Sequence, residues 1–251
     1  MNTVAPTRQI PLAGAHNLRD LGGYPTGRGG ATAWRRLLRS DGLHALTEQD
    51  VDRLRGIGLR TVIDLRSQQE AAYQPGRLVD EPGFTCLRIP LFSALAPINM
   101  AMAAQDFDLG QRYLDAIAQC GAAIAGVLTA IAEADDAPLL FHCTAGKDRT
   151  GLIAAFLLGM VGVGDDAIVA DYTLTSTLAE PLLRRLRETA AARGRRPEHV
   201  AALLSTPPDA MQRVLDRIRD EHGGIDGYIA RIGVGPALRE RLRRRLSGPA
   251  E

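Results

Sequence analysis

Residues 139–160 read LLFHCTAGKDRTGLIAAFLLGM, and this stretch decides the fold. Its first three residues are apolar and predict a short buried strand, while residues 152–161 are apolar on all sides and predict a buried helix. An eight-residue loop, 142–149, joins the two. A strand, a loop and a helix N-terminus in this order direct backbone N–H groups and the positive end of the helix dipole toward one anion. The stretch therefore predicts an anion site in an α/β protein.

Within this loop, five residues separate a cysteine from an arginine, Cys143 and Arg149. This spacing lets the loop close around one tetrahedral oxyanion, with the thiol beneath it and the guanidinium holding two of its oxygens. Gly146 permits the backbone to turn several N–H groups inward. The residues expected to bind the phosphate are Thr144, Ala145, Gly146, Lys147, Asp148 and Arg149.

The same surroundings are expected to activate Cys143. Inward N–H groups, the helix dipole and Arg149 all favour the thiolate, which is a competent nucleophile at neutral pH. We expect Cys143 to attack phosphorus, to release an alcohol or phenol, and to form a phosphocysteine that water then hydrolyses. Thr150 is expected to donate its hydroxyl to the sulfur and to help the sulfur leave in the second step.

Ten residues, 142–151, match the C-x5-R signature loop of the protein tyrosine phosphatase superfamily. The further matches are NLRDLGGY (17–24), RSD (39–41), VIDLRS (62–67) and DY (171–172). Together they resemble a bacterial branch typified by mycobacterial protein tyrosine phosphatase B, whose members are similar to both tyrosine and phosphoinositide phosphatases. The resemblance implies that Cys143 is the nucleophile and Arg149 the phosphate clamp, in a three-layer phosphatase fold. Lys147 and Asp148 are loop residues typical of this branch.

The proton for the leaving oxygen must come from a carboxylic acid. Trp34 is followed by Arg35, so the Trp-Pro-Asp acid loop of the eukaryotic tyrosine phosphatases is missing from the sequence. Asp148 lies beside Arg149, at the position that serves as acid in the similar loops of the myotubularin lipid phosphatases. Asp64, expected at the carboxyl end of a strand, is the competing candidate. We favour Asp148 because it needs no loop closure to reach the leaving oxygen.

Several other polar residues are expected to support the loop. Asn17, Arg19 and Asp20 precede two glycines and are interpreted as a polar turn that braces the site, with direct substrate contact as the alternative. His142 is interpreted as a hydrogen-bonding neighbour of the loop and as no metal ligand. Arg66 is interpreted either as the partner of a neighbouring carboxylate or as a residue at the mouth of the pocket.

The expected substrates are phosphomonoesters, with phosphotyrosine first and phosphoserine or phosphothreonine next. Lys147 is the only lysine among 30 basic residues, and its ammonium is a compact point charge, so we expect it to act at a substrate phosphate. Phosphoinositides are therefore the alternative substrates. Two rival functions are a phosphate-binding module without turnover and a sulfurtransferase of the rhodanese type, which lacks the spacing of Arg149 and Thr150.

We expect a single domain over residues 1–251, with a mainly parallel central sheet, helices on both of its faces and a helical C-terminal half. Strands are predicted at 31–38, 59–65 and 84–89, and a capped helix begins at Thr47. An irregular insertion at about 91–112 contains Met100 and Met102, for which core packing is the first interpretation and a lid over the site the alternative. Further helices are predicted at about 109–134, 152–161, 165–177, 181–193, 208–221 and 236–246. Residues 171–172 are interpreted as packing residues of one of these helices.

The composition excludes several classes of protein. A net charge of +1 and only five Phe, five Tyr and one Trp in 251 residues make a nucleic-acid partner improbable. Three widely spaced cysteines without a C-x-x-C pair predict neither a disulfide framework nor a metal site, and we expect no cofactor. The chain begins without a signal architecture and has no apolar run of about 20 residues, so we expect a cytoplasmic enzyme. Secretion without a leader and the oligomeric state stay open.

Two basic segments, 184–196 and 239–245, alternate with leucines in the manner of amphipathic helices. A solvated helix face is the first interpretation of both segments. Weak contact with an anionic membrane surface is the alternative, and it requires these arginines to share one face of the fold.

Overall fold

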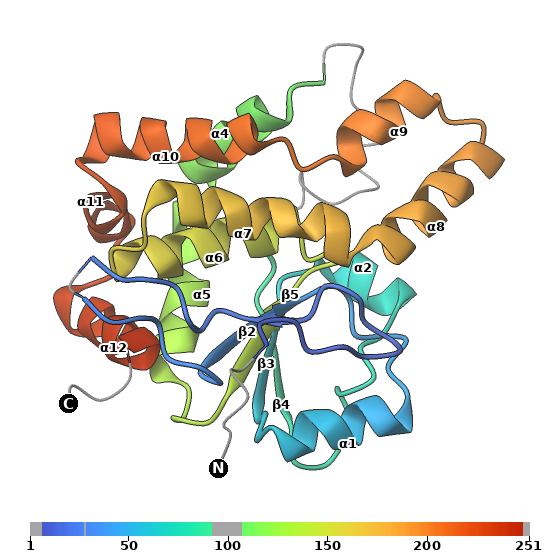
Figure 1. The fold of residues 1–251 in the computed structure, drawn as a ribbon, viewed down its shortest axis with the longest axis horizontal. Coiled ribbons are helices and arrows are strands. Elements are labelled where there is room, and N and C mark those ends of the chain that lie inside the picture. Colours follow the sequence, from blue (N-terminus) through green and yellow to red (C-terminus); the bar gives the residue numbers. More distant parts are fainter. Residues whose placement is uncertain (1–6, 28, 92–106, 248–251) are drawn as a thin grey trace.

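The computed structural model describes residues 7–27, 29–91 and 107–247. Its centre is a five-stranded sheet with the order β1-β2-β5-β3-β4, flanked by helices (Figure 1). Only β1 runs antiparallel to its neighbour, so the mainly parallel sheet of an α/β fold is confirmed. The strands are β1 (Arg19–Asp20), β2 (Leu37–Ser40), β3 (Thr61–Asp64), β4 (Thr85–Arg88) and β5 (Leu139–His142).

The strand β5 occupies the middle of the sheet and carries the decisive stretch. Leu139 pairs with Leu37 of β2 on one side and with Thr61 of β3 on the other, and all four residues of β5 are buried. A continuous apolar run is typical of a parallel strand that is covered on both faces. The register places the carboxyl ends of β2, β5 and β3 together at one edge of the sheet.

The two faces of the sheet pack against different helices because side chains alternate along each strand. Leu38, Val62 and Leu140 point toward α1 (Glu48–Gly56) and form one apolar cluster with its Val51 and Leu54. The opposite face joins a much larger cluster with the helices of the C-terminal half. These helices are α4 (Leu109–Gln119), α5 (Gly121–Glu133), α6 (Asp148–Met160), α7 (Asp165–Leu178), α10 (Pro208–His222), α11 (Ile225–Arg231) and α12 (Pro236–Ser247).

Three shorter or peripheral helices complete the described structure, namely α2 (Gln68–Tyr73), α8 (Glu180–Ala192) and α9 (Pro197–Leu204). The sequence predicted α8 but neither α2 nor α9, and it missed α11 as well. α2, α9 and α11 have six to eight residues each, which is too short for a helical period to stand out. The predicted cap at Thr47 is confirmed, since its side chain accepts the backbone N–H of Asp50 in a capping box.

Two predicted boundaries are wrong. The strand expected at 31–38 lies instead at Leu37–Ser40, because the Thr32 hydroxyl bonds to Leu21 O and Tyr24 N and holds that part of the chain in a turn. The single helix expected at about 109–134 is two helices, α4 and α5, bent by 77° at Cys120. The bend allows Gly121 to approach Ile232, whose Cγ2 would lie 2.8 Å from a Cβ at that glycine.

Most of the proposed lid lies outside the described residues, including Met100 and Met102. Within the remainder, Asp108 caps α4 by accepting the backbone N–H of Gln111, so residues 109–112 are the first turn of a helix.

Across residues 7–27, 29–91 and 107–247, no one helix combines the length and the apolarity that a membrane crossing requires. The bent pair α4 and α5 meets that test only when its two halves are counted together, and both halves bury their apolar residues in the larger core cluster. The same described residues contain no group of three or more His, Cys, Asp or Glu side chains placed to hold a metal ion.

Candidate active site

The candidate loop connects β5 to α6 at the carboxyl edge of the sheet. The strand includes His142 and the helix begins at Asp148, so the loop has five residues, 143–147, in place of the predicted eight. Asp148 and Arg149 consequently lie in the first turn of α6, where unpaired N–H groups and the helix dipole favour an anion. Cys143 is 3% exposed and Arg149 1% exposed, which places both in the shielded interior of the site.

Gly146 has a left-handed conformation, with φ of 65°. A Cβ at this position would lie 2.5 Å from Ser40 O and 2.7 Å from Asp41 N, both of which are backbone atoms. The loop is therefore pressed directly against the end of β2, and no side chain fits between them.

Replacing Gly146 by alanine is expected to lower the free energy of unfolding by about 2–4 kcal/mol, from backbone strain together with the clash. Denaturant unfolding measures this loss. Gly194→Ala is the matched control, since Gly194 has a φ of 66° and a Cβ added to it would meet no atom within 4 Å. An equal loss of unfolding free energy in the two variants would show that the close approach of Gly146 to β2 adds nothing to the cost of the substitution.

Arg149 is held by a carboxylate that the sequence did not identify, that of Glu70 in α2. Arg149 Nη1 donates to Glu70 Oε2 at 2.8 Å and Nη2 donates to Oε1 at 2.7 Å, a two-pronged contact. Thr144 of the loop donates its hydroxyl to the same Oε1 at 2.7 Å. Glu70 thus fixes the orientation of the guanidinium and ties it to the loop.

Local chemistry explains why Glu70 lies there. The Ser67 side chain accepts the Glu70 N–H while Glu70 accepts the Ser67 N–H, a capping box that begins α2 directly after β3 and Arg66. The Ser-x-x-Glu spacing that follows VIDLR was the available signal for this residue. Burial raises the pKa of Glu70, but the Arg149 hydrogen bonds and charge outweigh it and lower the pKa to about 2.

Glu70→Gln is expected to reduce kcat about tenfold, because the guanidinium loses the charged partner that aligns it. A lowered folded-state pKa means that the ionised carboxylate stabilises the protein above its ordinary pKa of 4.5 and that this contribution is lost as the pH falls toward 2. The difference in unfolding free energy between the wild type and the variant should therefore shrink from pH 5 to pH 2. Glu180→Gln, at an exposed ion pair with Arg187, serves as the control and should show no such pH dependence.

The two candidate acids have different surroundings. Asp64 accepts three hydrogen bonds from the Arg66 guanidinium and one from the Arg66 backbone, so Arg66 is the partner of a carboxylate. Burial raises the pKa of Asp64, yet the Arg66 hydrogen bonds and the nearby His142 lower it below the ordinary value. Asp148 is buried and accepts a hydrogen bond from the Tyr113 hydroxyl of α4.

Lys147 points away from the loop toward α9. Its Nζ donates to Leu203 O at 2.5 Å and to Ser205 O at 2.9 Å, and it lies 3.2 Å from Asp148 Oδ1. The ammonium is 2% exposed and joins the loop to the end of α9. Its expected contact with a substrate phosphate stays a prediction.

His142 and Thr150 flank the loop. His142 Nδ1 donates to Cys143 O at 3.1 Å, and burial lowers the pKa of the imidazole, so the ring is neutral and fixed. The Thr150 hydroxyl is buried and has no hydrogen-bond partner within the part of the chain that the structure describes. A donor without a partner, one residue after Arg149, is consistent with the predicted bond to the sulfur.

Asn17 and Arg39 donate hydrogen bonds to two backbone carbonyls of the loop. Asn17 Nδ2 donates to Ala145 O at 2.9 Å and to Gly146 O at 3.2 Å, and Arg39 Nη2 donates to Gly146 O at 2.7 Å. With these carbonyls turned outward, the adjoining N–H groups can face the anion site. The predicted bracing role of the NLRD segment therefore has a direct structural counterpart.

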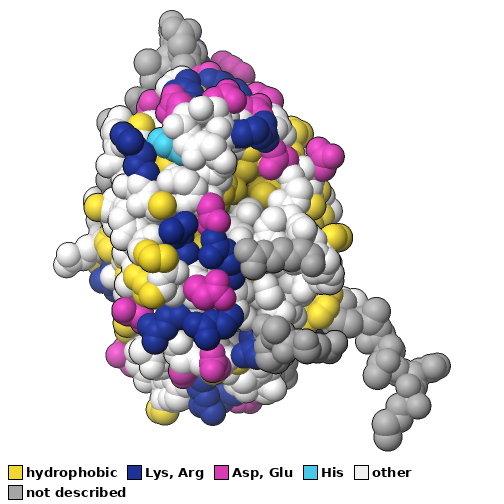
Figure 2. All heavy atoms as spheres, turned by 90° about the vertical axis from the view of Figure 1, so that its left-hand side faces the viewer, with side chains coloured by type: hydrophobic (Ala, Val, Ile, Leu, Met, Phe, Trp, Pro, Cys, Tyr) yellow, Lys and Arg dark blue, Asp and Glu magenta, His cyan; other side chains and the backbone are white. Residues whose placement is uncertain are grey.

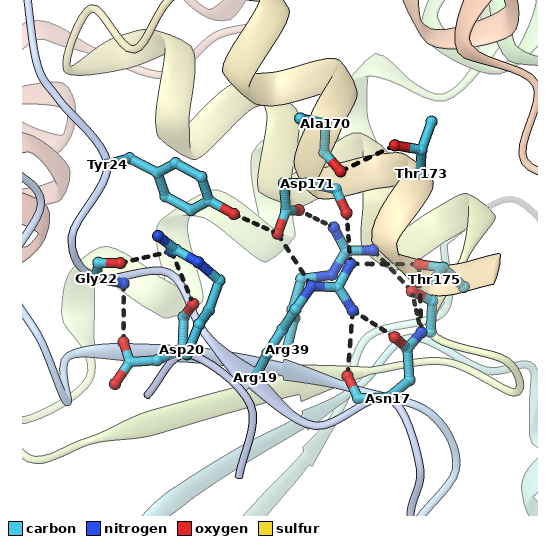
Figure 3. A network of polar contacts seen from close by, with 12 residues as sticks. Asn17, Arg19, Asp20, Gly22, Tyr24, Arg39, Ala170, Asp171, Thr173 and Thr175 are labelled. Atoms are coloured by element: carbon cyan, nitrogen blue, oxygen red, sulfur yellow. Dashed lines mark hydrogen bonds and ion pairs between the residues drawn. The ribbon is translucent and has the colours of Figure 1, made fainter. Parts of the chain in front are cut away.

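Both arginines of this network depend on one carboxylate, Asp171 of α7. Arg19 Nε donates to Asp171 Oδ1 at 3.0 Å, Arg39 Nη1 donates to Oδ2, and the Tyr24 hydroxyl donates to Oδ1 at 2.8 Å (Figure 3). Burial raises the pKa of Asp171, but the two guanidinium charges outweigh it and hold the pKa well below its usual range. The interpretation of Asp171 as a packing residue is therefore incomplete, since it is the anion at the centre of a buried charge network.

Asp20 supports a neighbouring turn. Its Oδ1 accepts Gly22 N and its Oδ2 accepts Arg35 N, each at 2.9 Å, and Arg35 has a φ of 60°. The carboxylate thus stabilises a backbone conformation that a residue with a side chain rarely adopts.

The chain is similar to several known proteins. Residues 10–248 match the model of the tyrosine phosphatase family. A tyrosine-protein phosphatase of Nostoc commune is 31% identical over 223 residues, which cover 83% of this chain and 73% of that protein. The triple specificity protein phosphatase PtpB of Mycobacterium tuberculosis is 31% identical over 283 residues, covering 96% of this chain and 99% of PtpB. Among solved structures, a TpbA variant from P. aeruginosa in complex with phosphotyrosine matches with a TM-score of 0.41 at 18% identity, covering 80% of this chain and 88% of that one.

Proposed function

Because this chain belongs to the tyrosine phosphatase family, it is a phosphotyrosine hydrolase, and we propose that Cys143 is its nucleophile. The observation that supports this assignment is the buried loop that runs from Cys143 to the N-terminus of α6, where Glu70 fixes Arg149. Burial alone would lower the pKa of Arg149, but the Glu70 hydrogen bonds and the nearby Cys143 sulfur raise it. The clamp therefore keeps its positive charge next to the sulfur.

In the first step, the Cys143 sulfur attacks phosphorus, so that an S–P bond forms while the bond from phosphorus to the phenolic oxygen breaks. Arg149 and the loop N–H groups hold the phosphoryl oxygens as negative charge develops on them. Asp148 gives its proton to the departing phenolic oxygen. In the second step, Asp148 takes a proton from water, whose oxygen bonds to phosphorus as the S–P bond breaks, and Thr150 donates to the departing sulfur.

The environment of Asp64 supports the choice of Asp148 as acid. Burial raises the pKa of Asp64, but the Arg66 hydrogen bonds outweigh it and lower the pKa, which disfavours Asp64 as a proton donor. Asp148 lies in the same helical turn as Arg149, the residue proposed to hold the phosphoryl oxygens. Asp148→Asn should therefore lower kcat strongly for poor leaving groups and spare activated phenols, whereas an equal loss for both would contradict the assignment.

Pre-steady-state hydrolysis of p-nitrophenyl phosphate tests the function. A phosphocysteine intermediate predicts a burst of p-nitrophenol close to one equivalent per enzyme whenever its hydrolysis is slower than its formation, and acid quenching should trap phosphate on Cys143. Binding of phosphate without hydrolysis of p-nitrophenyl phosphate would show that the protein is a phosphate-binding module. Turnover of thiosulfate in place of phosphate esters would show a sulfurtransferase.

The range of substrates beyond phosphotyrosine is part of the proposal. The name of PtpB, a triple specificity protein phosphatase, supports testing phosphoserine and phosphothreonine peptides beside phosphotyrosine peptides. Phosphoinositides belong in the same panel as the alternative that Lys147 suggested. Peptide turnover well above lipid turnover would support a phosphoprotein substrate, and the reverse would favour the lipid.

The C-terminal basic segment gives no support to a membrane contact. Arg243 pairs with Asp226 and Glu240, and Arg245 is 7% exposed and donates to backbone carbonyls. On the face shown in Figure 2, basic side chains lie among Asp and Glu side chains. The proposed partner is a phosphoprotein, which the names of the relatives support.

A further inference from the structure

The acid Asp148 contacts a tyrosine from outside the loop, and that tyrosine contacts a second one. Tyr113 of α4 donates its hydroxyl to Asp148 Oδ1, and the Tyr172 hydroxyl of α7 lies 2.9 Å from that of Tyr113. Tyr113 is 0% exposed and Tyr172 1% exposed, and their rings meet edge to face with centroids 6.0 Å apart. Asp148 thus accepts a hydrogen bond from one of two buried phenols that lie against each other.

The direction of these hydrogen bonds follows from proton counting. A phenol has one proton to donate, and Tyr113 uses its proton on Asp148, so Tyr172 must donate to the Tyr113 oxygen. Burial raises the pKa of Tyr113 well above its usual value, which keeps it a neutral donor. Two hydrogen bonds in series polarise one another and strengthen the bond to the carboxylate.

The two carboxyl oxygens of Asp148 have different contacts. Oδ1 receives the Tyr113 hydroxyl and lies 3.2 Å from Lys147 Nζ, which is itself anchored to the end of α9. No hydrogen bond from a residue that the structure describes reaches Oδ2. Because one oxygen is fixed, the plane of the carboxyl group is set, and Oδ2 is the oxygen available to carry a proton.

We propose that Tyr113 is a positioning residue that orients the general acid Asp148, with Tyr172 directing the Tyr113 hydroxyl. This inference rests on the proposed function, in which Asp148 protonates the leaving group. The proton passes from Oδ2 to the phenolic oxygen, its bonding pair stays on the carboxylate, and Tyr113 keeps its own proton throughout. The Tyr113 hydrogen bond stabilises the carboxylate as that charge forms.

The test is a series of aryl phosphates whose phenols increase in basicity. Tyr113→Phe should lower kcat about tenfold for phenyl phosphate, where protonation matters most, and less than about twofold for p-nitrophenyl phosphate. A plot of kcat against phenol basicity should therefore be steeper for the variant than for the wild type. The same loss with every phenol would overturn the proposal, since a merely structural defect has no reason to depend on the leaving group.

Tyr228→Phe is the matched control, because it also deletes one buried hydroxyl, which donates to Ile117 O at 2.8 Å and has no hydrogen bond to Tyr113 or Asp148. We expect a similar change in melting temperature and a much smaller dependence on the leaving group. In an Asp148→Asn background, adding Tyr113→Phe should cause no further loss with phenyl phosphate, since the acid on which Tyr113 acts is already gone. A full additional tenfold loss would refute the positioning role.

These outcomes separate the two proposals. An inactive wild type, or a fully active Cys143→Ser, would refute the proposed function itself. An active wild type whose Asp148→Asn variant depends on the leaving group, but whose Tyr113→Phe variant does not, would refute only the role of Tyr113.

Discussion

Cys143→Ser is expected to lower kcat for p-nitrophenyl phosphate by at least about 10⁴-fold. A serine hydroxyl is a poor nucleophile unless a base removes its proton, and the described surroundings offer none in a suitable state. The neighbouring His142 donates its Nδ1–H to a backbone carbonyl, and the Asp64 carboxylate accepts hydrogen bonds from Arg66. Steady-state kinetics and the loss of the phenol burst measure the effect.

Phosphate binding should survive the same substitution, because the N–H groups and Arg149 remain in place. We expect Cys143→Ser to be stabilised by inorganic phosphate in a thermal unfolding assay about as well as the wild type. Cys120→Ser is the control, since Cys120 is a partly exposed cysteine at the bend between α4 and α5 and should retain full activity. Residual turnover above about 10% in Cys143→Ser would rule out a covalent mechanism through this sulfur.

The parts of the site that could be predicted from the sequence are those built by contiguous residues. The strand, loop and helix around Cys143 follow from one apolar run, one glycine and one spacing, and these are local properties. The confirmed cap at Thr47 belongs to the same class. Even here the loop is shorter than predicted, because the polar residues His142 and Asp148 belong to the strand and the helix.

The residues that sequence reasoning missed reach the loop across long chain separations. Glu70 lies 79 residues before Arg149, Tyr113 lies 35 before Asp148, and Asp171 lies 132 after Arg39. Each is an ordinary polar residue on a helix, and periodicity gives no reason to aim it at the loop. Their positions depend on how α2, α4 and α7 pack on the sheet, which tertiary contacts decide.

The interpretation of residues 171–172 shows most clearly that a local sequence pattern does not predict contacts between distant parts of the chain. On the sequence, an Asp-Tyr pair in a helix gives no sign that two arginines more than 130 residues away converge on it. The matches NLRD and RSD did supply those arginines, but no local signal linked them to one carboxylate.

Asp171→Asn is expected to lower the free energy of unfolding by about 3–5 kcal/mol, the usual result of removing one partner from a buried ion pair. Asparagine keeps the shape of the side chain but removes its charge, so the fully buried Arg19 and Arg39 side chains lose their common counterion. A typical domain is stable by only about 5–15 kcal/mol, so the variant should unfold at a much lower denaturant concentration.

The pH dependence of this effect identifies its cause. The pKa of Asp171 is lowered in the folded protein, so its ionised form stabilises the fold above the ordinary value of 3.8, and that stabilisation is lost as the pH falls below it. The stability difference between wild type and Asp171→Asn should be constant from about pH 5 to pH 8 and should shrink in acid. Asp216→Asn, at an exposed pair with Arg219, should change stability by less than about 1 kcal/mol. Arg39 also donates to Gly146 O, so loss of its Asp171 partner should weaken phosphate binding as well. A destabilised variant with unchanged phosphate affinity would show that Asp171 stabilises the fold without supporting the loop.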